Sequence, residues 1–114
     1  MFGRSGNSVF EEILPQIRQR TLATTESLML CEATLECGSH VPPHRHEHEQ
    51  ITFIVEGRVR TRVGSETAEL EAGDVYAIPG GTEHEVHALT RARVVDVFTP
   101  HRAEYALERY VAPR

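Results

Sequence analysis

The chain has 114 residues and a formal net charge of −5 at pH 7. This length suits one domain with one modest core. Its arginines are scattered among glutamates and form no concentrated basic face, so neither nucleic acid nor an anionic membrane is expected as the main partner. The longest apolar run is only a few residues, and "MFGRSGNSVFEEIL" lacks the apolar core of a secretory signal, so a cytoplasmic protein is expected.

Two stretches near the termini tolerate a helical interpretation. The first is "VFEEILPQIRQ" (9–19), which Pro15 interrupts, and the second is "RAEYALERYV" (102–111). In the second stretch, Tyr105, Leu107 and Tyr110 could form a short amphipathic segment that docks on the same domain or on a second subunit. At most a short helical segment near a terminus is therefore expected.

The remaining pattern is that of strands. Apolar residues alternate with a period of two in "SLMLCEATLECG", "QITFIVEG" and "RVRTRVG", and "DVYAIP", "EVHAL" and "RARVVDVFTP" continue the β-branched pattern. Glycines punctuate these runs at turn positions. The residues that share one side of a predicted strand are Met29, Cys31, Ala33 and Leu35; Ile51, Phe53 and Val55; and Val59, Thr61 and Val63. This pattern predicts one all-β domain, a small sandwich or barrel.

The two cysteines are predicted to be free thiols. Cys31 and Cys37 lie six residues apart in the same predicted strand, which would separate them by roughly 20 Å at about 3.3 Å per residue. A disulfide needs Cα atoms within about 7 Å of each other. Free thiols fit a reducing cytoplasm, and each cysteine is expected to fill space in the core.

Four of the seven histidines lie in "HVPPHRHEHEQ" (40–50). Pro42 and Pro43 stiffen the approach to a strand. His44 and His46 are separated by one residue, and on a strand this spacing sends both imidazoles to the same face, which suits two ligands of one ion. The alternative from these residues alone is an exposed polar turn.

Two spaced patterns then resemble those of a known family. Gly38, His44, His46, Gln50 and Gly57 follow the spacing of the first cupin motif, with glutamine where the family usually carries glutamate. The second motif is matched by Gly73, Pro79, Gly81 and His84, with Ala88 where the family typically carries asparagine. The sequence thus resembles a single-domain cupin over about residues 27–99.

The resemblance implies a small β-barrel, a double-stranded β-helix, that holds one divalent transition-metal ion. It implies an N-terminal arm at 1–20, a barrel core at 27–99 and a tail at 100–114 of a single domain. Three imidazoles and an amide suit Ni, Zn, Fe, Mn or Co. The implied ligands are His44, His46, Gln50 and His84.

The other histidines are assigned by position. His40 is expected in a loop, and His87, of opposite parity to His84, should point away from the ion. His101 follows Pro100 and could line the mouth of the barrel. His48 shares the parity of His44 and His46 and remains an alternative ligand. Glu49 could replace Gln50 only if the strand slips by one residue.

A neutral Gln50 bears on the chemistry. Its amide oxygen would leave the double charge of the ion uncompensated, where glutamate would contribute one negative charge. This makes the ion a stronger Lewis acid and its higher oxidation state harder to reach. Polarisation of a substrate oxygen is therefore favoured over activation of dioxygen.

The stretch "VVDVFTPHR" (94–102) places a charge within an apolar strand. Val94, Asp96 and Phe98 share one face, and a buried carboxylate is costly unless it is paired or functional. The alternative is that Asp96 faces solvent on an edge strand. Arg102 could pair with Asp96 or bind a substrate carboxylate through its guanidinium.

A closer resemblance follows from two segments. "DVFTPHRAEY" (96–105) is similar to the "DVFSPxREDF" stretch of the KdgF-type pectin-degradation cupins, which also share "HxHxHEQ". The resemblance implies an enzyme that opens the ring of 4,5-unsaturated uronates and speeds their conversion to the linear keto form. It places Asp96, Phe98 and Arg102 in the active site beside the metal.

Two other classes of function stay open at this point. One is a cupin dioxygenase or other oxidoreductase that acts on a small molecule with the same ligands, which the neutral Gln50 disfavours. The other is a non-catalytic cupin that binds a small ligand. A small molecule, most simply a carboxylate-bearing sugar, is the expected partner. A homodimer is also expected, because small cupins expose sheet edges that dimerisation often covers.

Overall fold

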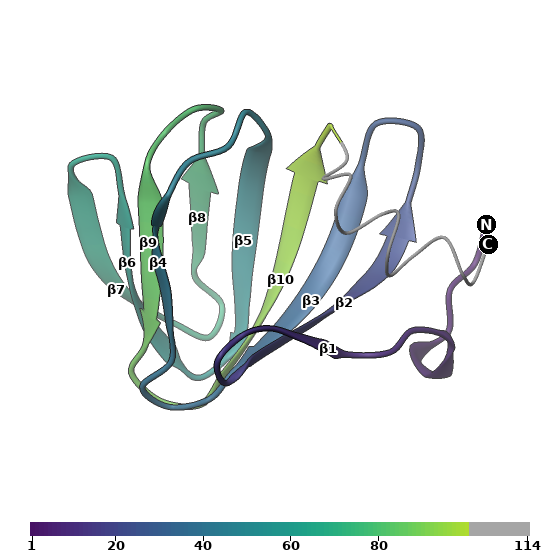
Figure 1. Ribbon diagram of the computed structural model, residues 1–114, viewed down its shortest axis with the longest axis horizontal. Helices are drawn as coiled ribbons and strands as arrows, with labels where there is room; N and C mark the ends of the chain where they lie inside the picture. The colour runs from purple at the N-terminus through teal and green to yellow at the C-terminus, as the bar shows by residue number, and fades with distance from the viewer. Residues whose placement is uncertain (101–114) are drawn as a thin grey trace.

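The computed structural model describes residues 1–100, which form two antiparallel sheets. The larger sheet has the order β1-β2-β3-β10-β5-β8, and the smaller has the order β4-β9-β6-β7 (Figure 1). A single 3-10 turn, Ser5–Asn7, precedes the strands in the described part of the chain. The strands are β1 (Glu11–Leu14), β2 (Ile17–Thr24), β3 (Met29–Leu35), β4 (His40–His44), β5 (Glu49–Glu56), β6 (Arg58–Val63), β7 (Glu66–Glu71), β8 (Val75–Ile78), β9 (His84–Ala88) and β10 (Ala92–Thr99).

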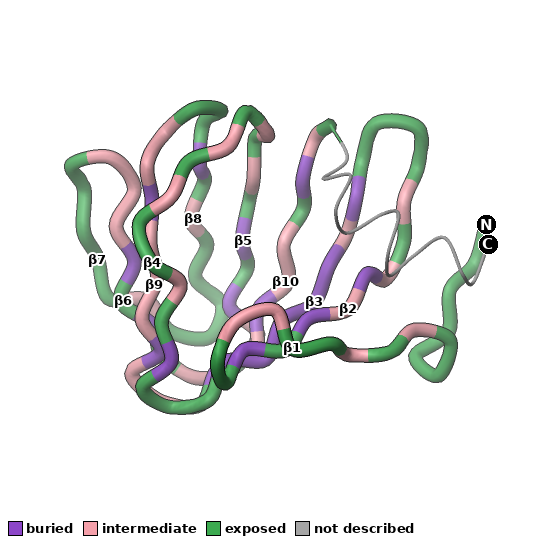
Figure 2. Tube along the Cα trace, viewed as in Figure 1, coloured by how far each residue is buried: buried purple, intermediate pink, exposed green. Residues whose placement is uncertain are grey.

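The predicted all-β class is confirmed, and a shared core joins the two sheets. Ile17, Leu35 and Ile54 of the larger sheet pack in one cluster with Val59 and Ala88 of the smaller sheet. Figure 2 shows most of the buried segments in the lower half of the view, where these strands converge. This core closes one end of the space between the sheets.

The turn between β5 and β6 depends on a glycine. Gly57 has a φ of 87°, in the left-handed region. A Cβ atom built there would lie 2.2 Å from the carbonyl oxygen of Arg91 and 2.7 Å from Cα of Ala92. The close approach brings the end of β5 against the start of β10, so no larger residue fits without a shift of the backbone.

The helical interpretation of residues 9–19 is wrong. β1 and β2 instead form a hairpin whose tight turn consists of Pro15 and Gln16, with Gln16 at a φ of 64°. Ile17 and Gln19 are buried and Arg18 is exposed, so the segment buries side chains with the period of a strand. Residues 11–24, most of which lie in the expected N-terminal arm, thus supply two strands of the larger sheet. The second helical stretch, 102–111, lies outside the described residues, as does the rest of the expected tail beyond residue 100.

The alternation on β5 is correct, but its apolar side faces outward. Ile51 and Phe53 are 54% and 43% exposed, whereas Thr52 and Ile54 are fully buried. Val75 of β8, the register partner of Phe53, is 58% exposed beside them. The outer surface of this part of the larger sheet is therefore apolar and exposed among the described residues.

Both cysteines are free, as predicted. Cys31 is buried in a small cluster with Met29 and Phe98, which fits the expected role as core filler. Cys37 lies beyond the end of β3 and is exposed, so the same role does not apply to it. No helix in residues 1–100 is long and apolar enough to cross a membrane. The cytoplasmic location stays a prediction.

Candidate metal centre

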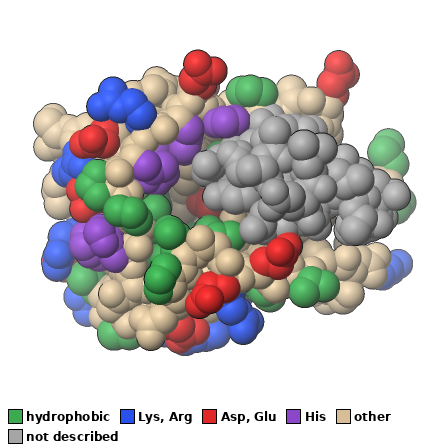
Figure 3. All heavy atoms as spheres, viewed as in Figure 1, with side chains coloured by type: hydrophobic (Ala, Val, Ile, Leu, Met, Phe, Trp, Pro, Cys, Tyr) green, Lys and Arg blue, Asp and Glu red, His purple; other side chains and the backbone are tan. Residues whose placement is uncertain are grey.

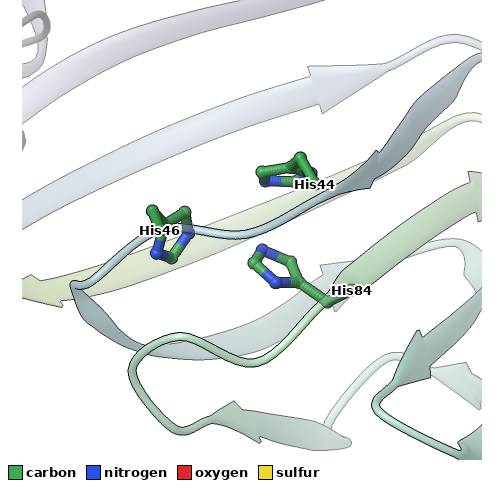
Figure 4. Close-up of side chains that lie close together, drawn as sticks. All are labelled: His44, His46 and His84. Carbon is green, nitrogen blue, oxygen red and sulfur yellow. The ribbon is translucent and has the colours of Figure 1, made fainter.

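Three histidines converge on one point between the sheets. His44 is the last residue of β4, His84 is the first residue of β9, and His46 lies in the loop that leads to β5. The strand register pairs His44 with His84. One ring nitrogen from each of the three residues lies within 4.8 Å of the others, an arrangement that could hold a metal ion (Figure 4).

Backbone carbonyls orient all three imidazoles in the same way. Nδ1 of His44 lies 2.9 Å from the carbonyl oxygen of Pro42, Nδ1 of His46 lies 3.0 Å from that of His48, and Nδ1 of His84 lies 2.8 Å from that of Thr82. A carbonyl oxygen only accepts, so each Nδ1 must carry the proton. In the neutral imidazole this leaves the lone pair on Nε2, the form in which histidine binds metals.

Gln50 stands beside this group, held by two partners. Its amide nitrogen Nε2 donates to Thr52 Oγ1 at 2.9 Å and to Asp96 Oδ1 at 3.3 Å. Because an ionised carboxylate only accepts, this contact sets the orientation of the amide and turns Oε1 of Gln50 toward His46. The distance from Oε1 to Nε2 of His46 is 3.2 Å.

The donor set fits a cation. With the proton of His46 on Nδ1, its Nε2 and the Oε1 of Gln50 are both electron-pair donors, and two such atoms at 3.2 Å repel each other unless a proton or a cation lies between them. A divalent ion between the three Nε2 atoms and this oxygen would satisfy all four. His44, His46, His84 and Gln50 are thus the residues that would hold it.

Asp96 lies on the inner side of β10. Its neighbours on that side, Val94 and Phe98, are 6% and 2% exposed, so the alternative of a solvent-facing Asp96 is wrong. Oδ1 of Asp96 also accepts a hydrogen bond from Thr52 Oγ1 at 2.6 Å. Gln50 therefore connects the carboxylate of Asp96 to the histidine group, because its amide nitrogen contacts Asp96 and its amide oxygen faces His46.

Phe98 closes one side of the group. Its ring centroid lies 6.2 Å from that of His46, nearly perpendicular to it. Phe98 is also the register partner of Gln50. Arg102 and His101, the remaining predicted residues of the site, lie outside the described residues.

A cavity of about 500 Å³ opens beside the histidines. At one end, its lining includes His44, His84, Gln50, Asp96 and Phe98. The other end is aliphatic, with lining residues that include Ile13, Leu14, Ile17, Leu35, Val86 and Val94. The site thus joins a polar, ligand-rich wall to an apolar one, which suits a small organic molecule.

Tyr76 is a residue of the cavity that the sequence analysis missed. It lies on β8, opposite Thr52, and lines the cavity with Asp96. Burial, and then the nearby negative charge of Asp96, raise the pKa of the Tyr76 phenol, so it stays protonated. The side chains of Thr52 and Thr61 act in the opposite direction and lower the pKa of Tyr76, but by less. The only signal in the sequence was a tyrosine within an apolar strand, "DVYAIP".

The other predictions on this stretch have mixed outcomes. His87 points away from the three histidines, as expected, and contacts Glu85 and His40 instead. His40 is the first residue of β4 and not part of a loop, because it pairs with His87 across the strands. His48 lies outside the group of three that could hold an ion, although its ring is 5.4 Å from that of His46. Glu49 is exposed and shows no slip of the strand register.

Comparison with known proteins agrees with this geometry. Residues 31–98 match the family model for the cupin domain. The chain belongs to the cupin family. KdgF from Halomonas sp. superposes with a TM-score of 0.86 at 29% identity, covering 91% of this chain and 96% of that one.

Two further relatives are similar to this cupin. An RmlC-like cupin from Shewanella frigidimarina NCIMB 400 superposes with a TM-score of 0.87 at 25% identity, over 91% of this chain and 94% of that structure. An uncharacterized protein of Streptomyces coelicolor, SCO3923, is 33% identical over 67 residues, which are 58% of this chain and 64% of that protein.

Proposed function

We propose that this cupin is a metal-dependent enzyme that opens the ring of 4,5-unsaturated uronates and converts them to the linear keto form. The observation that carries the proposal is the position of Asp96. A carboxylate lies in the cavity, hydrogen-bonded to the amide of Gln50, whose oxygen faces His46. This puts a proton-carrying group next to a set of ligands. The likeness to KdgF from Halomonas sp. supports the same assignment.

A divalent ion held by His44, His46, His84 and Gln50 would supply Lewis-acid polarisation of a substrate oxygen. The protein's own part in the chemistry is to move a proton. Asp96 accepts the proton of the anomeric hydroxyl as the bond between C1 and the ring oxygen breaks, and the proton is returned to C4 as the resulting enolate becomes a ketone. The conversion is an isomerisation, so it needs no oxidant or reductant.

Neighbouring groups prepare Asp96 for this role. The hydroxyl of Thr52 donates to Oδ1 at 2.6 Å and fixes the carboxylate in the cavity. Phe98 supplies an apolar wall against the sugar ring. Arg102 is assigned to the substrate carboxylate through paired N–H bonds. It lies outside the described residues, and among residues 1–100 no arginine or lysine lines the cavity.

The aliphatic end of the cavity favours a second candidate. Ile13, Leu35 and Val94 form a surface that gains little from a hydroxylated sugar. A cupin oxidoreductase that acts on a less polar small molecule would use this end. Oxygen uptake separates the two candidates: the metal-loaded protein should consume no oxygen with flavonols, thiols or diketones, and robust, metal-dependent uptake would make the oxidoreductase the better assignment.

The uronate activity can be followed directly. The substrate absorbs in the ultraviolet through its C4=C5 bond, and ring opening followed by tautomerisation removes that bond. Protein loaded in turn with Ni, Zn, Fe, Mn or Co should speed the loss of absorbance, and the His46→Ala protein should not. If no loaded form of the wild-type protein speeds it, the uronate assignment fails.

A homodimer is also proposed. The exposed side chains of Ile51, Phe53 and Val75 form a continuous apolar surface on neighbouring strands β5 and β8, and such surfaces often mark protein contacts. Light scattering should give twice the mass of the chain, and the monomer mass for Phe53→Lys. A monomeric wild-type protein would contradict the proposal.

A further inference from the structure

A second group of metal-binding side chains lies on the opposite face of β9. His40, Glu85 and His87 each offer one ligand atom, and the three atoms lie within 4.8 Å of one another. Val86 packs against the core, and its neighbours Glu85 and His87 therefore point to the outer side of the smaller sheet. Figure 3 shows histidine side chains gathered in two separate places on the face in view.

One carboxylate oxygen is shared by the two imidazoles. Oε1 of Glu85 lies 3.2 Å from Nε2 of His87 and 3.7 Å from Nε2 of His40. The register of β4 against β9 pairs His40 with His87, and their rings stack at a centroid distance of 3.9 Å. Two nitrogens and one oxygen from two neighbouring strands therefore lie close together.

Arg62 orients the carboxylate toward the histidines. Its Nε donates to the other oxygen, Oε2 of Glu85, at 2.8 Å, so Oε1 is left facing the rings. A ligand held in position by a neighbouring hydrogen bond is a common feature of metal sites.

Two features weaken this group as a site. The side chains of His40 and His87 are 39% and 38% exposed, and the guanidinium of Arg62 adds positive charge nearby. The rings are also stacked only 11° from parallel, so they must tilt before both lone pairs meet at one ion. Binding should therefore be weaker than at the three inner histidines.

We propose that His40, Glu85 and His87 form a second, weaker site for a divalent transition-metal ion, with Zn²⁺, Cu²⁺ or Ni²⁺ as the ions this donor set prefers. The bound ion takes the place of the proton between His87 and Glu85 and joins β4 to β9 from the outside. Both strands also carry an inner histidine, His44 or His84. Of the three residues, Glu85 also lines the cavity, and ion binding at this second site requires no catalysis.

Equilibrium dialysis of the untagged protein against Zn²⁺ tests the proposal. The decisive pair is His46→Ala and His46→Ala/His87→Ala, because the first variant removes an inner ligand and the second also removes an outer one. The expected stoichiometry is about one ion per chain for the first and none for the second. Zn²⁺ should also raise the Tm of the first variant and leave that of the second unchanged.

A matched control removes a charge from the same surface without removing a ligand. Glu69 lies on the outer side of β7, 3.7 Å from Arg58 and 3.9 Å from Arg60. Glu69→Gln in the His46→Ala background should keep its one ion. Circular dichroism checks that each variant is folded. Equal stoichiometry with and without His87, or the same loss in the Glu69→Gln control, would overturn the proposal, and neither result depends on the uronate activity.

Discussion

The two faces of β9 carry two different histidine groups. On the inner face, the Nδ1 atoms of His44, His46 and His84 all lie against backbone carbonyls, which aims three Nε2 atoms at one point. On the outer face, His40 and His87 stack on each other, and a carboxylate bonded to Arg62 provides the third donor. Backbone contacts thus prepare the inner group for an ion, whereas the outer group must first rearrange.

The largest effect is expected from His46→Ala. It removes one of three converging imidazoles and the partner of Gln50 Oε1. The inner ion and the uronate activity should both be lost, and the Tm of metal-loaded protein should fall, because bound metal stabilises the folded state. Elemental analysis and thermal melts measure this. If His46→Ala has the same Tm and the same metal content as wild-type protein, and His87→Ala then removes the metal, the inner group holds no ion.

Asp96→Asn should cut turnover roughly 100-fold or more and leave the inner ion in place. The asparagine keeps the shape of the side chain and an oxygen that can accept from Gln50 or Thr52, but it cannot carry the proton. Turnover and metal content are measured on the same sample. A variant that loses its ion together with its activity would make Asp96 a residue that positions Gln50 and not the base.

A third charged cluster provides a contrast with both sites. Glu32 of β3 is 5% exposed and bonds to Arg20 at 2.7 Å and Arg93 at 2.9 Å. Burial alone would raise the pKa of Glu32, but the hydrogen bonds from Arg93 and Arg20 outweigh it and lower the pKa below its ordinary value of 4.5. Glu32→Gln should lower the free energy of unfolding by about 2 kcal/mol and change neither metal content nor turnover.

The stabilisation by Glu32 should depend on pH, because the pKa of Glu32 is lower in the folded protein than in the unfolded chain. A carboxylate with a lowered pKa in the folded state contributes stability above its unfolded pKa and loses it as the pH falls through the folded value. The difference between wild-type protein and Glu32→Gln should therefore be constant near neutral pH and close below about pH 4.5. Urea unfolding at several pH values measures it. A difference that persists unchanged in acid would contradict an ionic origin.

Much of the fold and part of the site could be predicted from the sequence. Alternation by two predicted the strands. The resemblance of two spaced motifs to those of cupins predicted that His44, His46 and His84 meet, whereas His46 lies in a loop and not on the strand that its one-residue spacing from His44 suggested. The sequence pattern also placed Asp96 with Val94 and Phe98. It did not reveal Tyr76, whose place in the cavity depends on the pairing of β8 with β5.

Local sequence determined which side chains share a face, and only the tertiary structure decided which face is inside. On β5 both sides read as plausible, since Ile51 and Phe53 alternate with Thr52 and Ile54, and the packing of the two sheets buried the second pair. The hairpin of β1 and β2 likewise depends on β3 as a partner. The outer group of His40, Glu85 and His87 exists because β4 pairs with β9, and this contact between residues at least 40 positions apart is encoded by no local pattern.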